Sequence, residues 1–366
     1  MSFVATSELG RRQTDVLIIG GGQAGIAAAH AMKAEGIDFL LLEADTIGSS
    51  WQKRWDGLTL FSNRSYSALD GMPMRGDAQG YPDKEEMARY LIECAAPLAD
   101  RLIDNSRVIG LTKGRNEFTA LLASGRSITA TAVVVATGPF QVPKVTKSIA
   151  SGLHPDVRQL TVADFDKGAL AEGRTLIVGG GASGRQIASL LAPSHEVWLA
   201  CRSRVHIQPY KILGVDTMEL MDRLGVLWAA PSTIRGRLAM SIEAFPGPQY
   251  RNRQLASAGV KIVKAACKAQ GASVQFADGQ VASFRNVVWA AGYRTDDSWI
   301  NIPGATEDGQ AIQKRGISPI PGLFFLGRSF QTCRASALIC GVSRDALLLR
   351  RAIVEYRRTS VSEGHH

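Results

Sequence analysis

Two glycine-rich loops, each directly after an apolar run, constrain the fold of this chain more than any other feature. Residues 20–25 (GGGQAG) and residues 179–184 (GGGASG) both fit the pattern G-x-G-x-x-G. The preceding residues, 15–19 and 175–178, are almost entirely apolar, which is typical of parallel strands buried on both faces. A buried strand that leads into such a loop and then into a helix indicates a Rossmann-type dinucleotide-binding unit. The chain therefore predicts an α/β fold with two Rossmann-like units.

The glycines of the first loop have separate roles in such a unit. Gly20 permits the tight turn, Gly22 lets a pyrophosphate approach the backbone, and Gly25 lets the helix pack closely on the strand. The alanine-rich residues 26–34 predict that helix. Its N-terminus would face the phosphates with free N–H groups and the positive end of the helix dipole.

The second loop repeats this arrangement. Gly179, Gly181 and Gly184 take the three glycine positions, and residues 185–191 predict the helix. We add Ser183, which lies within the loop, to the predicted cofactor-binding residues.

The residue that follows the second strand of each unit differs in charge between the units. Glu43 lies 23 residues after Gly20, and a carboxylate there accepts hydrogen bonds from a ribose diol. At the same spacing the second unit has Arg202, with Arg204 close behind. A guanidinium holds a 2′-phosphate with paired hydrogen bonds, so we expect NADP(H) in the second unit. The alternative is that both arginines are solvated and that Ser203 or a backbone group holds the ribose of NADH.

Two further strand-plus-glycine segments frame the second unit. Residues 133–136 lead into Thr137 and Gly138, and residues 287–291 lead into Gly292. Glycine is expected where the chain crosses between units beside a bound cofactor, because a side chain there would clash with the ligand. We therefore include Thr137, Gly138 and Gly292 among the cofactor-binding residues.

The chain returns to the first unit after the second crossing. Residues 323–326 predict a short strand that ends at Gly327, another predicted cofactor contact, and a largely helical C-terminal segment follows. We expect residues 1–143 and 293–366 to form an FAD-binding domain, and residues 144–292 to form an NAD(P)H-binding domain inserted in it.

The composition argues against several other classes of protein. The net charge of +9 is not accompanied by a nucleic-acid-binding motif, so we expect no nucleic-acid partner. No apolar run approaches the ~18 residues that cross a bilayer, and the N-terminus lacks the pattern of a signal peptide, so we expect no membrane partner. The five cysteines are scattered and include no Cys-x-x-Cys pair, which favours a reducing cytoplasm. The six histidines show no metal-ligand spacing, so we predict no metal site.

Other short segments, in their order along the chain, resemble the flavin-containing monooxygenases, especially the shorter bacterial members. These segments are residues 47–51 (IGSSW), 55–58 (WDGL), 81–82 (YP), 136–140 (ATGPF), 291–294 (AGYR), 321–327 (PGLFFLG) and 341–346 (GVSRDA). The likeness runs from about residue 14 to about residue 350. One family pattern, F-x-G-x-x-x-H-x-x-x-[YF], is degenerate here. Only Phe165 fits it, and Thr161 stands in place of the histidine.

The resemblance implies an FAD-dependent monooxygenase that consumes NAD(P)H and dioxygen. Its small-molecule substrate would be a soft nucleophile, such as a sulfide or an amine, or a ketone, oxygenated through a flavin hydroperoxide. The resemblance also suggests a homodimer. It places Ser50 and Trp51 at the flavin, gives Trp51 and Phe61 the role of walling the ring from water, and gives Asn63 a hydrogen bond to the peroxide. The alternative for Trp51, as for Trp55, is that it is an ordinary core residue.

Three rival functions share this fold or its cofactors. A disulfide reductase would need a redox-active cysteine pair near the flavin, and the sequence has no such pair. A reductase or oxidase that consumes NAD(P)H and releases peroxide stays open because of the degenerate pattern. The third is a low-turnover flavoprotein that acts as a redox partner of another protein.

Overall fold

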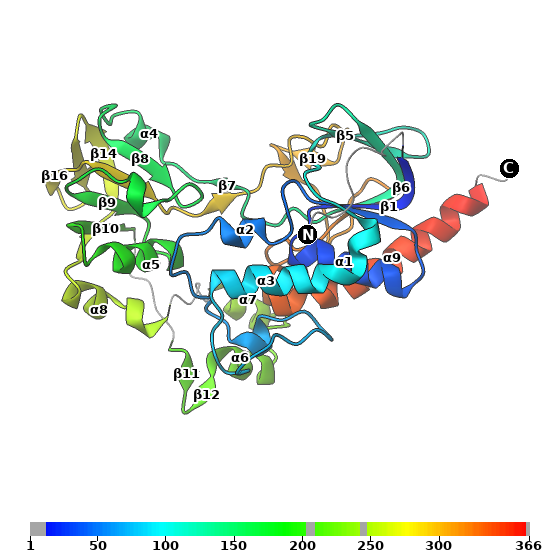
Figure 1. Cartoon of the computed structure of the whole chain (residues 1–366), viewed down its shortest axis with the longest axis horizontal. Coiled ribbons are helices and arrows are strands. Elements are labelled where there is room, and N and C mark those ends of the chain that lie inside the picture. The colour runs from blue at the N-terminus through cyan, green and yellow to red at the C-terminus, as the bar shows by residue number, and fades with distance from the viewer. Residues whose placement is uncertain (1–11, 203–208, 242–246, 364–366) are drawn as a thin grey trace.

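The computed structural model describes residues 12–202, 209–241 and 247–363. It contains two large sheets, which lie at opposite ends of the molecule (Figure 1). The chain builds most of the first sheet, then all of the second, and then returns to add one more strand to the first. The predicted α/β fold with two nested Rossmann-like units is confirmed.

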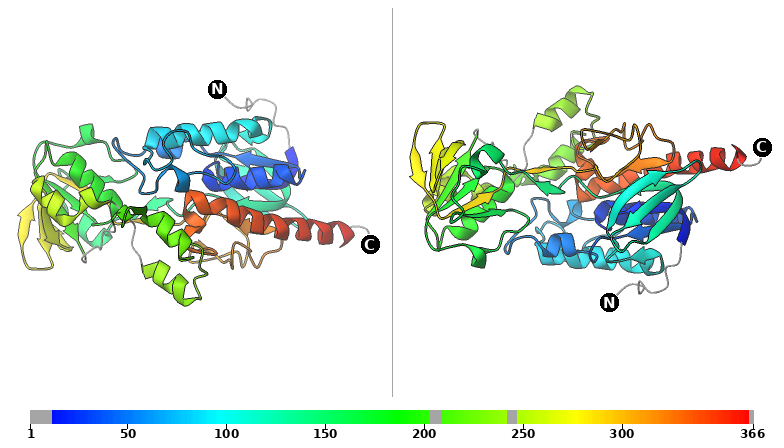
Figure 2. Two further views of the ribbon diagram at one scale, coloured as in Figure 1. Left: turned by 90° about the horizontal axis from the view of Figure 1, so that it is seen from below. Right: turned by 90° about the horizontal axis from the view of Figure 1, so that it is seen from above.

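The first sheet has seven strands in the order β3-β2-β1-β6-β5-β4, with β21 also paired to β6. The strands are β1 (Arg12–Ile19), β2 (Phe39–Leu42), β3 (Leu102–Ile103), β4 (Val108–Lys113), β5 (Phe118–Leu122), β6 (Ser127–Val135) and β21 (Leu323–Phe325). The central strands are parallel, whereas β4 and β5 are antiparallel additions at one edge. The helices α1 (Gln23–Ala34), α3 (Lys84–Ala95) and α9 (Ile339–Glu363) belong to this unit, and Figure 2 shows the long red helix α9 alongside the blue strands. Because residues such as Ile18 and Leu41 are fully buried against these helices, the sheet core reads as continuous apolar runs in the sequence.

The second sheet has five parallel strands in the order β13-β10-β9-β17-β8. They are β8 (Arg158–Thr161), β9 (Thr175–Val178), β10 (Val197–Cys201), β13 (Lys261–Lys264) and β17 (Asn286–Trp289). A three-stranded antiparallel sheet adjoins it, formed by β14 (Ala266–Gln270), β15 (Ser273–Phe276) and β16 (Val281–Ser283). Trp198 packs between Phe276 and Phe284 and joins the two sheets in one core. The helices of this unit are α4 (Lys147–Ala150), α5 (Ala182–Leu191) and α8 (Asn252–Ser257).

The two crossings between the units lie side by side. β7 (Val142–Pro143) leaves the first unit, β18 (Tyr293–Arg294) re-enters it, and the two short strands pair antiparallel. A further small hairpin, β19 (Thr306–Glu307) and β20 (Gln310–Ala311), follows in the first unit.

Residues 209–241 leave the second sheet after β10 and lie against the first unit instead. They form β11 (Lys211–Ile212), β12 (Val215–Asp216), α6 (Thr217–Arg223) and α7 (Ile234–Ser241). The backbone nitrogen of Ala335 donates to the carbonyl of Leu227, and Arg334 donates to the carbonyl of Ala239 at 2.7 Å. This segment lies between two strands of the second sheet in the sequence but packs on the first unit, an arrangement that the sequence patterns do not indicate.

Candidate functional site

The first glycine loop lies between β1 and α1, at the C-terminal edge of the first sheet. Gly20 has a φ of 108°, and a Cβ there would stand 2.8 Å from the carbonyl oxygen of Ala136. A Cβ at Gly25 would stand 1.8 Å from the carbonyl oxygen of Gly20. At Gly22, in contrast, no neighbouring atom of the described residues lies within 4 Å of the Cβ position. Packing requires glycine at Gly20 and Gly25, whereas Gly22 borders open space of the kind a pyrophosphate needs.

The second loop has the same geometry at the edge of the second sheet. A Cβ at Gly179 (φ 124°) would stand 2.2 Å from the carbonyl oxygen of Ala290, and a Cβ at Gly184 would stand 1.9 Å from that of Gly179. Gly181 again borders open space, with no neighbouring described atom within 4 Å of its Cβ position. Ser183 lies half-buried in the first turn of α5. The repeated geometry indicates two dinucleotide sites.

Glu43 is held beside the first loop. Its Oε2 accepts a hydrogen bond from the backbone nitrogen of Gly21 at 2.7 Å, and its Oε1 accepts one from that of Asp45 at 3.0 Å. A carboxylate oxygen accepts more than one hydrogen bond, so capacity remains for ribose hydroxyls. The acid is thus oriented before any ligand binds.

The sequence analysis missed a second acid, Asp104, which follows β3 as Glu43 follows β2. Asp104 is 6% exposed, and its Oδ1 has no hydrogen-bond partner among the residues that the structure describes. Burial, together with the nearby charge of Glu43, raises the pKa of the Asp104 carboxyl. Its position directly after a buried strand could have identified Asp104 in the sequence, because ligands bind at the C-terminal ends of parallel strands.

Arg202 lies exposed directly after β10, and Arg204 lies outside the described residues. The sequence analysis did not identify Arg185 in α5, which is 1% exposed. Its guanidinium donates to the carbonyl of Gly180 at 2.7 Å and to Oδ1 of Asn252 at 2.8 Å. Arg185 therefore ties the second glycine loop to the start of α8.

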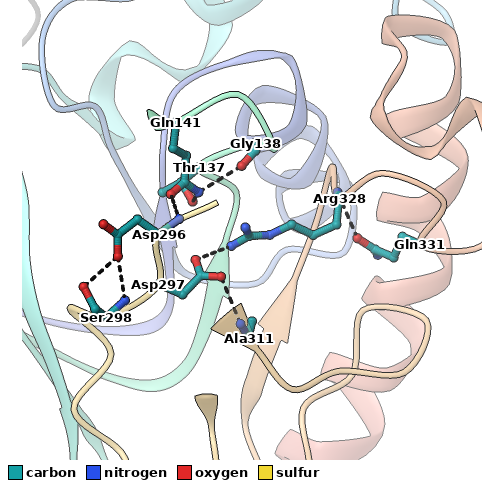
Figure 3. A network of polar contacts seen from close by, with 9 residues as sticks. All are labelled: Thr137, Gly138, Gln141, Asp296, Asp297, Ser298, Ala311, Arg328 and Gln331. Carbon is teal, nitrogen blue, oxygen red and sulfur yellow. Dashed lines mark hydrogen bonds and ion pairs between the residues drawn. The ribbon is translucent and has the colours of Figure 1, made fainter. Parts of the chain in front are cut away.

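The two crossing segments are joined by Gln141 (Figure 3). Its Nε2 donates to Oγ1 of Thr137 and to the carbonyl of Gly138, both at 2.9 Å, and its Oε1 accepts from the backbone nitrogen of Asp296 at 2.8 Å. Gly138 and Gly292 have φ values of 70° and 89°, and both border open space. These contacts hold the predicted crossing residues together without filling the space beside them.

The end of β21 lies next to the first loop. Gly327 has a φ of 78°, and a Cβ there would stand 2.8 Å from the Cβ of Ala24 in α1. The next residue, Arg328, is buried and forms an ion pair with the buried Asp297 at 2.7 Å.

The aromatic segment predicted to face the flavin begins at α2 (Ser49–Gln52). Ser50 is exposed, Trp51 is half-buried against the core of the first unit, and Trp55 is buried within that core. Arg54 reaches the crossing, where its guanidinium donates to the hydroxyl of Tyr293 at 2.5 Å. The segment is thus brought to the place where the two units meet.

Asn63 is completely buried at the start of a short 3₁₀ helix. Its Oδ1 accepts from the backbone nitrogen of Tyr66 at 3.2 Å, and its Nδ2 donates to Oε1 of Gln79 at 3.3 Å. An amide nitrogen carries two hydrogens, so one remains for another acceptor. The predicted hydrogen bond to a peroxide therefore stays a prediction, alongside a capping role.

Phe61 lies half-buried near the segment of residues 209–241, together with Tyr210 and Met218. The ring of Tyr210 stacks on that of Tyr81 with centroids 4.3 Å apart, and the Tyr81 hydroxyl donates to Asp216 at 2.7 Å. Burial and this hydrogen bond raise the pKa of Tyr81. These contacts join the segment of residues 209–241, which Phe61 borders, to Tyr81 of the first unit.

Some classes of site are not seen in the described part of the chain. No group of three His, Cys, Asp or Glu side chains there is arranged to hold a metal ion. No helix in those ranges is both long and apolar enough to pass through a membrane. All five cysteines are free.

The fold and the two loops define a protein with two Rossmann-type dinucleotide-binding units. A protein-family model described as pyridine nucleotide-disulphide oxidoreductase matches residues 17–211. The CzcO-like oxidoreductase of Geobacillus kaustophilus is 36% identical, with 93% of this chain and 99% of that protein covered. The indole-3-pyruvate monooxygenase YUCCA1 of Oryza sativa is 26% identical, with coverages of 94% and 93%.

Solved structures agree with this assignment. A flavin-containing monooxygenase from Stenotrophomonas maltophilia is 25% identical, with a TM-score of 0.78 and coverages of 94% and 99%. The complex of OTEMO with FAD and NADP, at 16% identity and a TM-score of 0.68, shares the fold. The chain belongs to the pyridine nucleotide-disulphide oxidoreductase family and, within it, to the flavin monooxygenases, as the sequence resemblance predicted. It is a flavin-dependent oxidoreductase, and OTEMO, which shares its fold, was solved with both FAD and NADP.

Proposed function

We propose that the enzyme uses NADPH and dioxygen to oxygenate a small soft nucleophile, a sulfide or an amine, or a ketone. In this proposal residues 1–143 and 293–366 bind FAD, and residues 144–292 bind NADP(H). The paired strands β7 and β18 support this division, because they mark the two places where the chain passes between the sheets.

The residues present fit both dinucleotides. Gly22 and Gly181 each leave open a space that a Cβ would enter, at the position where a pyrophosphate approaches the loop. In the first unit, the fixed carboxylate of Glu43 suits the adenosine ribose of FAD. In the second unit, the exposed Arg202 suits a 2′-phosphate. When bound, FAD supplies the hydride acceptor and the chemistry with dioxygen.

In this proposal the protein would have to bring the two bound dinucleotides together and exclude water. The contact of Arg54 with Tyr293 draws the aromatic segment to the crossing. The stacked rings of Tyr81 and Tyr210 join the segment of residues 209–241 to the first unit. Aromatic side chains of this kind limit the access of water to the reacting atoms, which protects the reactive intermediates of the oxygenation from decay.

The observation that carries oxygenation over disulfide reduction is the composition of the segment at the crossing. Residues 51–63, which include Trp51, Phe61 and Asn63, contain no cysteine, and Arg54 within this segment contacts Tyr293 at the crossing. Cys94 and Cys201 are buried, and burial raises the pKa of each thiol, which disfavours the thiolate that disulfide exchange requires.

A second candidate function, an NAD(P)H oxidase that releases peroxide, is favoured by one observation. Thr161, in the place of the family histidine, uses its hydroxyl and its backbone nitrogen to donate to Asp164 at 2.5 and 2.6 Å. Because Thr161 is already hydrogen-bonded within its own turn, it is less available for a contact that links the binding of the coenzyme to the reaction of the flavin.

One experiment separates these functions. Oxygen uptake, NADPH oxidation, peroxide and organic product are measured together, with methyl phenyl sulfide, a tertiary amine or cyclohexanone as substrate. A monooxygenase forms sulfoxide, N-oxide or lactone in proportion to the NADPH consumed. NADPH consumption that yields only peroxide with every substrate supports the oxidase and overturns the proposal.

A further inference from the structure

Arg328 is a buried cation, and the roles proposed for the two glycine loops do not explain why it is there. Its side chain is 8% exposed, and its Nη2 donates to Oδ1 of Asp297 at 2.7 Å. Asp297 is 1% exposed, and its Oδ2 accepts from the backbone nitrogen of Ala311 at 3.1 Å. Figure 3 shows the Arg328 side chain extending from the end of β21 toward Asp297, below Thr137 and Gly138. The guanidinium is therefore held in one position.

One buried donor of this guanidinium, its Nε, lacks a hydrogen-bond partner among the residues that the structure describes. Leaving a buried donor without an acceptor costs about 1–3 kcal/mol, and more for a charged group. Native proteins retain few such groups, and each one requires an explanation. An acceptor supplied by a ligand would satisfy Nε.

The position of Arg328 indicates which ligand. β1, β6 and β21 are parallel neighbours, with Ile19 and Phe325 both paired to Val135. Their C-terminal ends therefore reach the same edge of the sheet, which is where ligands bind in such folds. Gly327, the residue before Arg328, lies against Ala24 of the first glycine loop. Arg328 thus starts beside the loop proposed to hold the FAD pyrophosphate and runs toward the crossing.

We propose that Arg328 is a cofactor-contacting residue, whose Nε donates a hydrogen bond to an oxygen or nitrogen acceptor in the ribityl–flavin half of FAD. This inference rests on the proposed binding of FAD by the first unit. Asp297 neutralises part of the guanidinium charge, and the remaining positive field would raise the reduction potential of a bound flavin, because reduction adds negative charge. Asp297 positions the guanidinium for both effects.

The test compares Arg328→Gln with Asp297→Asn, which breaks the same ion pair but leaves the arginine. FAD affinity is measured by titration of the apoprotein, and the flavin midpoint potential by dye equilibration. We expect Arg328→Gln to weaken FAD binding by ten- to a hundredfold, the loss of one charge-assisted hydrogen bond, and to lower the potential. Asp297→Asn should lower Tm and change both readouts less.

Equal behaviour of the two variants, with FAD affinity and potential close to wild type, would mean that Arg328 only pairs with Asp297, and the inference would fail. If Arg328→Gln does not fold, Arg328→Lys decides. It keeps the charge and loses the Nε hydrogen, so the potential should stay near wild type while FAD binds more weakly. Unchanged FAD affinity in this variant overturns the inference. A wild-type protein that binds no FAD would instead refute the proposed function.

Discussion

The Oε2 of Glu43 accepts a hydrogen bond from the backbone nitrogen of Gly21 at 2.7 Å, so this acid and the glycine loop of the first unit form one rigid piece. The corresponding residue of the second unit, Arg202, is exposed. A preorganised site loses less conformational freedom on binding and therefore binds more tightly. This difference is consistent with a retained flavin in one unit and an exchangeable coenzyme in the other.

The open space at Gly22 and Gly181 predicts a matched pair of variants. Both glycines have ordinary φ values, −76° and −75°, so a side chain is compatible with the fold. Gly22→Val should fold and lose FAD, because the side chain enters the space for the pyrophosphate. Gly181→Val should keep FAD and lose NADPH binding. Flavin absorbance and NADP⁺ titration check both. Loss of FAD from both variants to the same extent would contradict the assignment of one dinucleotide to each unit.

Arg202 predicts coenzyme choice. NADPH should be favoured over NADH by roughly ten- to a hundredfold in kcat/KM, nearer tenfold because solvent screens an exposed charge. Arg202→Ala should raise the KM for NADPH and leave NADH almost unaffected. Steady-state kinetics with each coenzyme provide the measurement. Equal losses with both coenzymes would show that Arg202 serves the fold and not the phosphate.

Asp104 predicts a pH-dependent stability of the apoprotein. Its folded pKa is raised by burial and by Glu43, so the folded state binds its proton more tightly than the unfolded state. Ionised Asp104 therefore destabilises the fold at pH 7, and the penalty disappears as pH falls through the raised value toward the ordinary one, ~3.9. Asp104→Asn should raise the Tm of the apoprotein at pH 7 and have little effect near pH 4. The control is Asp70→Asn at an exposed position. A lower Tm for Asp104→Asn at pH 7 would contradict this account.

The cysteines predict a single reactive thiol in the native protein. Cys267 is exposed, whereas burial raises the pKa of Cys340 to about 12 and also raises those of Cys94 and Cys201. Iodoacetamide at pH 8 should add one label, located by peptide mass spectrometry, and Cys267→Ser should abolish it. Rapid labelling of a second cysteine without unfolding would reopen a thiol-based mechanism.

The two roles considered for Asn63, capping the 3₁₀ helix and donating a hydrogen bond to the peroxide, can be separated by mutation. Asn63→Ser keeps an oxygen that can cap the 3₁₀ helix but removes the amide donor, so the fold should be retained. Product formed per NADPH should fall severalfold while peroxide release rises. Gln79→Ala removes the partner of Asn63 but not the amide, and it should leave the coupling near wild type. If both variants lose coupling equally, Asn63 only supports the local structure.

Local patterns in the sequence predicted the parts of the fold that depend on local spacing. The runs before Gly20 and Gly179 are the strands β1 and β9, and the helices α1 and α5 begin within the loops as expected. The fixed distance from loop to second strand also located Glu43, because strand, helix and strand follow in order along the chain.

The missed residues depend on contacts between segments far apart in the sequence. Arg328 pairs with Asp297, and Asp104 lies near Glu43 only because β3 pairs with β2. No periodicity encodes such pairings. The packing of residues 209–241 on the first unit could not be predicted from the sequence for the same reason. The sequence of a segment that connects two strands of one sheet contains no pattern that shows whether the segment packs on another unit.

The pairing of β7 with β18 has a further consequence for how this protein can be taken apart. Paired strands lie about 4.8 Å apart, so both ends of the second unit are near neighbours. The second unit could therefore be exchanged for the corresponding unit of a relative with another coenzyme preference. Only two chain connections would have to be made, and both lie at the same place. The segment of residues 209–241 sets the condition for such a graft. It must keep its contacts with Tyr81 and Arg334, or the first unit loses this packing with the exchange.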